Sequence, residues 1–151
     1  MIDQREVILA RLEVILSGIT GFEYAGRNPV SISETLRPAV AFYDGDEQRL
    51  IDPPSPRRAG AAPPVVIRMK PPIIVAAETG ASNVGTETNA ARRLVLTAIL
   101  SDATLLQMTF NGAGLIYDGG QFGLSKGEKT QGDITIDLSI DYLFKPSDLV
   151  A

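Results

Sequence analysis

The side chains that most often carry out catalysis are missing from this sequence. It contains no histidine and no cysteine. Without cysteine the chain has no disulfide, no thiolate nucleophile and no thiolate metal ligand. Without histidine it lacks the usual proton shuttle near neutral pH and the commonest zinc ligand. Any enzymatic site would therefore depend on carboxylates, alone or with magnesium, or on a phosphate-binding loop.

The segment 123–130 is the nearest approach to a phosphate-binding loop. That pattern requires glycine directly before its Lys-Thr pair, so that backbone amides can approach phosphate, but Glu128 occupies this position. The segment also leads into a predicted strand, whereas a phosphate-binding loop leads into a helix. We therefore interpret it as a hairpin loop in which Lys126 and Lys129 are either solvated or contact a partner in an assembly.

The acidic segment 44–47 invites comparison with a calcium-binding loop. Counted from Asp44, such a loop needs glycine at its sixth position and an acidic residue at its twelfth. Arg49 and Ser55 occupy these positions, so the pattern fails. An acidic turn is the better interpretation, because the Asp-Gly pair at 44–45 favours a tight turn.

Three aspartates, Asp133, Asp137 and Asp141, recur at every fourth position of a predicted strand. Neighbours in this series lie about 13 Å apart, too far for two carboxylates to act together on one bond. A solvated sheet face explains them, although the same face could line a channel or meet a partner. A carboxylate and magnesium enzyme is therefore the least supported function.

Arg57 and Arg58 form a cationic pair in a segment, 52–64, that contains five of the ten prolines. Proline cannot donate a backbone hydrogen bond to a sheet, so the segment is predicted to be a long extended loop. The arginines could bind carboxylates or phosphates through two parallel hydrogen bonds, or they could simply increase solubility.

Two main helices are predicted to position these residues. Asp3 and Glu6 have the spacing of a capping box, in which Asp3 accepts a backbone N–H and Glu6 reaches back. Apolar residues then recur at helical spacing and form one stripe: Ile8, Leu12, Ile15, Leu16 and Ile19. The helix is expected to end near Gly18. A second helix is predicted over 86–100, followed by a short capped helix through Met108.

The remaining apolar segments predict a sheet. Short strands are expected at 22–27 and 38–43. The segment 65–77 has strand character but is interrupted by Pro71-Pro72, which predicts a proline bulge close to a sheet edge. Apolar residues recur at every second position from Ile134 to Phe144, as in a long antiparallel strand with one buried and one wet face.

The predicted partner of that strand is 115–117, joined to it through a glycine-rich loop at 118–132. Together these elements predict one α+β domain over residues 1–151. Its mixed, mostly antiparallel sheet of about four to five strands would pack against two main helices, with long loops at 52–64 and 118–132.

Composition limits the partners. The formal charge of −4 and a pI of about 4.8 disfavour binding to a phosphate backbone, which needs a concentrated positive face. No stretch approaches the roughly 18 apolar residues that a membrane span requires, and the N-terminus does not have a signal-peptide pattern. We expect a soluble protein with no membrane partner and no cofactor.

The order of elements resembles that of the tail terminator, or tail completion, proteins of long-tailed bacteriophages and related prophage elements. The similarity spans nearly the whole chain but consists of order and spacing, without a diagnostic motif. The carrying features are the first helix, Arg27-Asn28, the stretches 36–40, 43–47 and 69–74, the helix 89–100, and the closing 140–146.

The resemblance implies a mixed α/β fold without catalytic residues. It further implies a homohexameric ring at the head-proximal end of the tail tube, assembled in the host cytoplasm and retained in the virion. Such a ring ends tube polymerisation and joins the tail to the head-tail connector, with DNA passing through its lumen only as cargo. No family motif identifies the contact residues of such a ring. From the predicted loops and strand edges we infer these candidate assembly contacts: Arg57, Arg58, Pro71, Pro72, Lys126 and Lys129.

Two other functions fit the same sequence. One is a neighbouring neck or head-tail joining protein, which would bind filled heads instead of tail tubes. The other, from a different class, is a peptide-binding adaptor that uses an exposed strand edge and would be a monomer that binds extended peptides.

Overall fold

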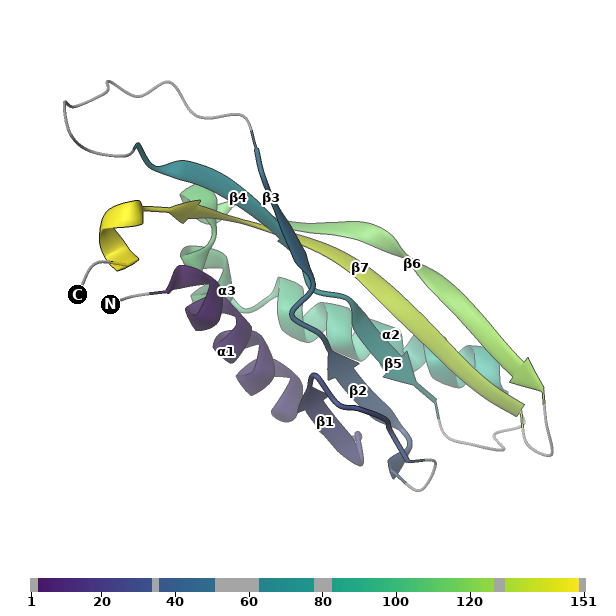
Figure 1. Cartoon of the computed structure of the whole chain (residues 1–151). Helices are drawn as coiled ribbons and strands as arrows, with labels where there is room; N and C mark the ends of the chain where they lie inside the picture. The colour runs from purple at the N-terminus through teal and green to yellow at the C-terminus, as the bar shows by residue number, and fades with distance from the viewer. Residues whose placement is uncertain (1–2, 34–35, 51–62, 78–82, 127–129, 150–151) are drawn as a thin grey trace.

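The computed structural model describes residues 3–33, 36–50, 63–77, 83–126 and 130–149. They form one sheet with helices on one of its faces (Figure 1). The helices are α1 (Gln4–Ser17), α2 (Val84–Leu100) and α3 (Ala103–Met108). The strands are β1 (Tyr24–Arg27), β2 (Ala39–Phe42), β3 (Asp46–Arg49), β4 (Val65–Lys70), β5 (Ile73–Ala76), β6 (Leu115–Lys126) and β7 (Thr130–Phe144).

The mixed α+β class is therefore confirmed, with more elements than expected among the described residues. Seven strands replace the predicted four to five, and short 3₁₀ turns accompany the two main helices and the short helix α3 that the sequence also predicts. The strands nevertheless form only five rows, because β4 and β5 follow one edge of β7 in succession, and β3 and β2 follow the next row in the same way.

β7 is the central strand of the sheet. Its residues from Ile140 to Phe144 pair with β4, those from Asp133 to Ile136 pair with β5, and β6 pairs along its opposite edge. All these pairings are antiparallel, and of the pairings between described strands only that of β1 with β2 is parallel. The outermost strands are β6 on one side and β1 with β3 on the other.

α1 begins as the sequence predicts. The Asp3 carboxylate accepts hydrogen bonds from the backbone N–H groups of Arg5 and Glu6, at 3.1 and 3.4 Å, which satisfies donors that the first helical turn leaves free. The expected return of Glu6 to the cap is wrong, because its carboxylate binds Arg27 of β1 instead. Four members of the predicted apolar stripe are buried, Ile8, Leu12, Ile15 and Leu16, together with Leu9. The fifth, Ile19, lies beyond the end of α1 and is only partly buried.

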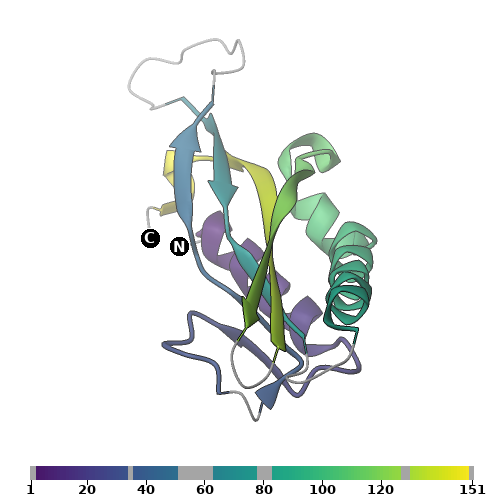
Figure 2. The same cartoon turned by 90° about the vertical axis from the view of Figure 1, so that its right-hand side faces the viewer.

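α2 and α3 are also confirmed. α2 buries Val95, Leu96 and Ile99 and contacts both α1 and β7; in Figure 2 it lies to the right of the strands. Asp102 then caps α3 by accepting a hydrogen bond from the backbone N–H of Leu105 at 2.7 Å. These helices could be predicted from the sequence because the spacing of their apolar residues matches the face that packs against the core.

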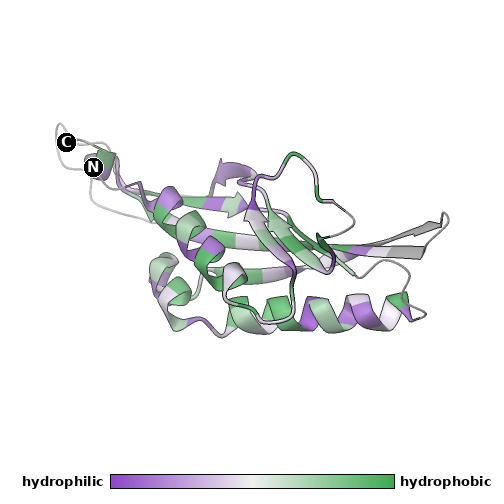
Figure 3. Cartoon of the chain, turned by 90° about the horizontal axis from the view of Figure 1, so that it is seen from below, coloured by the Kyte–Doolittle hydropathy of each residue, from purple (hydrophilic) through white to green (hydrophobic). Residues whose placement is uncertain are grey.

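The core lies between the helices and one face of β7. Alternate β7 side chains contribute to it: Ile134, Ile136, Leu138, Ile140 and Tyr142. Seen from the helix side, apolar segments of α1 and α2 lie against this face (Figure 3). The opposite face of β7 is only partly wet, contrary to expectation, because Ser139 and Asp141 are 1% and 9% exposed. Arg68 binds Asp141, and Asp118 accepts a hydrogen bond from Ser139.

Three rows of the sheet are interrupted at the same level. Gly45 separates β2 from β3, Pro71-Pro72 separates β4 from β5, and a bulge at Asp118 shifts the register of β6. The pairs Asp46–Lys70 and Phe42–Ile73 show that the first two breaks lie side by side. We call this level the sheet break; β7 is the strand that runs through it without interruption.

The prediction of a tight turn at 44–45 is wrong, because the chain bends there without reversing its direction. Gly45 does adopt a left-handed conformation, with φ of 70°, but β3 continues the direction of β2 instead of folding back on it. A side chain at Gly45 is also excluded by space, because a Cβ would lie 2.2 Å from the Lys70 carbonyl oxygen. The glycine therefore permits a bend beside the neighbouring row.

Two other expectations need correction. Pro71-Pro72 does not lie at a sheet edge, because β4 and β5 are paired on both sides. The predicted loop 118–132 is largely a hairpin, since β6 extends to Lys126 and β7 starts at Thr130. Most of the other predicted loop, 52–64, lies outside the described residues. No helix within the described ranges has the length and apolar character to cross a membrane.

Candidate functional site

The six residues predicted as assembly contacts do not gather in one place. Arg57, Arg58 and Lys129 lie outside the described residues. Lys126 is the last residue of β6. Pro71 and Pro72 lie inside the sheet at the sheet break, where Pro71 is buried. Their role as contacts remains a prediction.

A pocket of about 450 Å³ opens beside Pro71 and Pro72. Its wall also carries one lysine and three carboxylates: Lys70, Asp46, Asp118 and Asp137. Within the described ranges, no three acidic side chains are grouped closely enough to hold a metal ion. The charges around this pocket are therefore mixed, and they do not form a metal-binding set.

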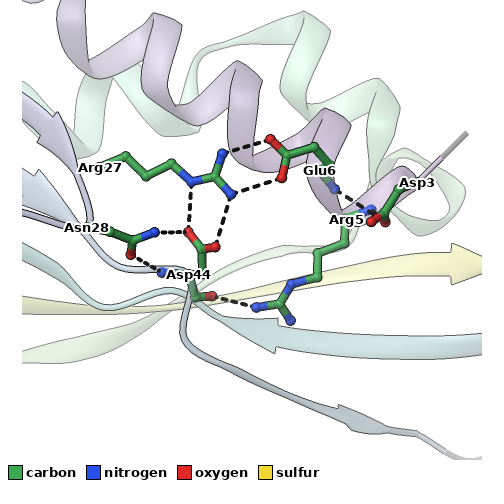
Figure 4. A network of polar contacts seen from close by, with 6 residues as sticks. All are labelled: Asp3, Arg5, Glu6, Arg27, Asn28 and Asp44. Carbon is green, nitrogen blue, oxygen red and sulfur yellow. Dashed lines mark hydrogen bonds and ion pairs between the residues drawn. The ribbon is translucent and has the colours of Figure 1, made fainter.

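A polar network ties the sheet break to the start of α1 (Figure 4). The Arg27 guanidinium donates two hydrogen bonds to Asp44, at 2.8 and 3.0 Å, and two to Glu6, at 2.8 and 2.9 Å. Arg5 donates to the backbone oxygens of Asp44 and Gly45, at 3.1 and 2.8 Å. This network holds three elements together: α1, β1 and the segment after β2.

The charges of this network reinforce one another. Hydrogen bonds from Arg27 lower the pKa of the Asp44 carboxyl, and they lower the pKa of the Glu6 carboxyl as well. The same two carboxylates raise the pKa of the Arg27 guanidinium. All three groups are therefore charged near neutral pH, and a carboxylate held in this state is a poor general acid.

Tyr142 extends the network into the core. Its hydroxyl donates a 2.9 Å hydrogen bond to Glu47 of β3, and Glu47 also pairs with Arg5 at 2.9 Å. Burial, followed by the Glu47 contact, raises the pKa of the Tyr142 hydroxyl. The phenol therefore stays protonated and links β7 to the outer strand β3.

Three further aspartates are paired with arginines from distant parts of the chain. Asp141 accepts two hydrogen bonds from Arg68, at 2.8 and 3.0 Å. Arg37 donates to Asp133 at 2.9 Å. Arg11 donates to Asp102 at 3.1 and 2.6 Å. Two of the three aspartates in the predicted β7 series therefore have structural partners.

A shallow apolar groove of about 510 Å³ separates α1 from α2 on the outer side of the helices. Val14 and Leu94 line it and are 59% and 49% exposed. The Arg11–Asp102 pair also lies on its wall. Sequence periodicity does not reveal this groove, because Val14 lies outside the predicted apolar stripe of α1 and a helical pattern does not show which surfaces of two helices meet.

The strand edges are the other candidate surfaces. β6 has twelve residues, and among the described elements only β7 pairs with it. β3 has four exposed residues and pairs only with β4 in the described part of the sheet. Sequence analysis missed β3 entirely and expected only three residues of β6.

By its fold the chain is a mixed α+β protein, and several of its arginines form ion pairs with carboxylates from distant parts of the sequence. No protein-family model matches it, and no curated protein matches it.

Proposed function

We propose that this chain is a structural assembly subunit of the kind that ends the tail tube of a long-tailed bacteriophage. Several copies form a ring, hexameric by the resemblance, at the head-proximal end of the tube. The ring stops the addition of tube subunits and presents the surface that the head-tail connector binds. In this role the protein belongs to the virion and is not an enzyme.

The free edge of β6 is the observation that carries the proposal. An edge strand exposes unpaired backbone N–H and C=O groups, and long free edges are normally shortened, blocked or paired. β6 is twelve residues long, and no other described strand covers its outer side. Phe122 on this strand is 50% exposed. A partner chain that covers the edge would satisfy the backbone groups and bury this side chain.

The described charged groups support a structural role. Asp44, Asp102, Asp133 and Asp141 each accept hydrogen bonds from an arginine. These pairs fix elements that are distant in sequence, which suits a rigid subunit. The negative formal charge also suits a ring through which DNA passes without binding, since like charges repel at short range.

Imaging and light scattering test the proposal directly. The purified protein is expected to form rings of uniform size in negative-stain images and to appear at the ends of purified tail tubes when the two are mixed. Monomers alone, both with and without tube subunits, would overturn it. Rings that attach to filled heads but never to tubes would instead identify a neck protein, and a monomer that binds extended peptides would identify an adaptor.

A further inference from the structure

We infer that neighbouring copies in the ring are joined edge to edge, with β6 of one copy paired to β1 of the next. This inference rests on the proposed ring and adds the surfaces that build it. A cyclic ring requires two different, complementary patches on each subunit. β6 and β1 are outer strands on opposite sides of the same sheet, and each pairs with one described strand only, β7 and β2 respectively.

β1 is the edge that is available on its side of the sheet. On the other outer strand of that side, β3, Arg49 already has an interaction partner, and the Gly45 oxygen just before the strand accepts a hydrogen bond from Arg5. β1 carries no such contact. Within the described ranges, the backbone groups of Ala25 and Arg27 have no hydrogen-bond partner on the side away from β2, so they are free to bind another strand.

Strand direction supports the pairing. β1 is parallel to β2, whereas β2 is antiparallel to β5, β5 to β7, and β7 to β6, so β1 and β6 run in opposite directions. A ring whose axis runs along the strands preserves these directions from copy to copy. The junction between β6 and the next β1 is then antiparallel, and the sheet continues from subunit to subunit.

The levels of the two strands fix the register. A closed ring has no rise from one copy to the next, so strands that join must lie at the same height along the axis. Across the sheet, Tyr24 aligns through β2, β5 and β7 with Gly123, and Arg27 aligns in the same way with Gly120. β1 of one copy therefore meets residues 120–123 of its neighbour, with Ala25 opposite Phe122.

The outward backbone groups of β1 belong to two residues. The hydrogen bond from Asn28 N–H to the Phe42 oxygen shows that Asn28 directs its backbone groups toward β2. Backbone groups alternate in direction along a strand, so Gly26 also faces β2, and Ala25 and Arg27 face outward.

The same reasoning applies to β6. The hydrogen bond from Asp141 N–H to the Gly114 oxygen shows which β7 residues face β6. Carried along the β6–β7 pairing, it directs the backbone groups of Gly120 and Phe122 outward. In the register set by the strand levels, these residues lie opposite the two outward residues of β1. Each pair can therefore exchange N–H···O bonds, which a shift by one residue would prevent.

Side chains select the same register, because every small residue faces a larger one. The pairs are Tyr24 with Gly123, Ala25 with Phe122, Gly26 with Gln121, and Arg27 with Gly120. Phe122, which is 50% exposed in the single copy, covers Ala25. Gly120 leaves room for the Arg27 side chain, which keeps its contacts with Glu6 and Asp44. A shift by two residues in either direction would place Gly26 opposite another glycine, Gly119 or Gly123.

Engineered disulfides test the junction, and the natural chain provides a background without cysteine. Tyr24 and Gly123 would form a non-hydrogen-bonded pair with Cα atoms about 4.5 Å apart, within reach of a disulfide. Within one copy the two strands are four strand spacings apart, about 19 Å, so the cross-link can form only between copies. A Cβ at Gly123 meets only the Asp133 oxygen at 3.9 Å, so cysteine fits there.

The double variant Tyr24→Cys, Gly123→Cys is expected to give, on oxidation, a ladder of covalent oligomers that reduction removes. The matched control is Tyr24→Cys combined with Gln121→Cys. Its cysteines would lie on the same sheet face but would be diagonal neighbours about 7–8 Å apart, so cross-linking should be at least about tenfold slower.

The outcomes separate the junction from the ring. Oligomers without the Tyr24–Gly123 cross-link, or equally fast cross-linking in the control, would overturn the edge pairing and leave the ring standing. A covalent dimer from Gly123→Cys alone would show that β6 pairs with itself and would also overturn the edge pairing. Wild-type protein that is monomeric under all conditions would overturn the ring itself.

A proline provides the second test. The Phe122 N–H points outward in the β6 pairing, so Phe122→Pro removes an edge donor without removing a β6–β7 hydrogen bond. The variant is expected to be folded by circular dichroism but monomeric by light scattering. Phe122→Ala loses the same aromatic ring, keeps the donor and should still form rings. Rings that persist in folded Phe122→Pro would contradict the proposed junction.

Discussion

Arg27 and Asp44 face each other in a two-pronged contact, with Nε 2.8 Å from Oδ1 and Nη2 3.0 Å from Oδ2. The same guanidinium holds both carboxylate oxygens of Glu6. One side chain therefore joins β1, the bend before β3 and the first turn of α1. Since Arg27 is only 19% exposed, this contact fixes where the sheet break lies relative to the helices.

Replacing Arg27 by methionine should lower the free energy of unfolding by about 1–2 kcal/mol, because Glu6 and Asp44 lose charge-assisted hydrogen bonds while both remain partly hydrated. Urea denaturation followed by circular dichroism measures the change. Arg93→Met is the matched control, since Arg93 is exposed on α2. It should change stability by less than about 0.5 kcal/mol. Equal losses in both variants would contradict the structural role of Arg27.

The same network predicts a pH dependence. Arg27 lowers the pKa of Glu6 from its ordinary 4.5 and that of Asp44 from its ordinary 3.8. Groups with a lowered pKa in the folded state stabilise it above their unfolded pKa, and this contribution is lost as the pH falls through the folded pKa. Wild-type stability should therefore drop between about pH 5 and pH 3 more steeply than that of Arg27→Met. Parallel urea midpoints across this range would refute the coupling.

Of two glycine substitutions, Gly45→Ala and Gly85→Ala, the first should be the more damaging. Alanine at a φ of 70° is strained, and its Cβ would lie 2.2 Å from the Lys70 oxygen. We expect a loss of at least about 2 kcal/mol in the free energy of unfolding. Gly85→Ala, in the first turn of α2, meets no atom within 4 Å and should stabilise by about 0.5–1 kcal/mol. Thermal unfolding of both variants gives the comparison.

Tyr142→Phe removes the hydroxyl that reaches Glu47 from the core. The ring remains buried, so the expected loss is that of one hydrogen bond to a partly exposed carboxylate, about 1 kcal/mol. Tyr24→Phe is the control, because the Tyr24 side chain lies over Gly26 on the edge strand β1. Its unfolding midpoint in urea should stay near the wild-type value. A similar shift in both would argue against a specific role for the Tyr142 hydroxyl.

The helices and β7 could be predicted because the spacing of their apolar residues in the sequence matches the side chains that the fold buries. β3 could not, since its sequence, Asp-Glu-Gln-Arg, is polar throughout and all four residues are exposed. It is a strand because β4 offers it a paired edge, which local sequence does not encode. The glycines of β6, such as Gly119 and Gly120, weaken its strand propensity, and the pairing with β7 compensates.

The ion pairs were beyond prediction for a different reason. Arg37 and Asp133 are 96 positions apart, and Arg68 and Asp141 are 73 apart. A charged residue gives no signal of its partner in a single sequence, so Asp133 and Asp141 appeared to be solvated. The sheet register accounts for both pairs: β4 brings Arg68 against β7, and β5 lies between β7 and β2, which begins two residues after Arg37.

The position of β7 has a consequence for how the protein forms during synthesis. β7 is the latest strand in the sequence, yet it is the strand against which β4, β5 and β6 all align. While the ribosome is still adding residues 130–144, the earlier strands lack their shared neighbour, and α1 and α2 lack the sheet face that they cover. Such late, non-local closure is slow compared with local folding. We therefore expect nascent chains that stop before residue 130 to remain sensitive to protease, and chains that include β7 to become resistant in a single step.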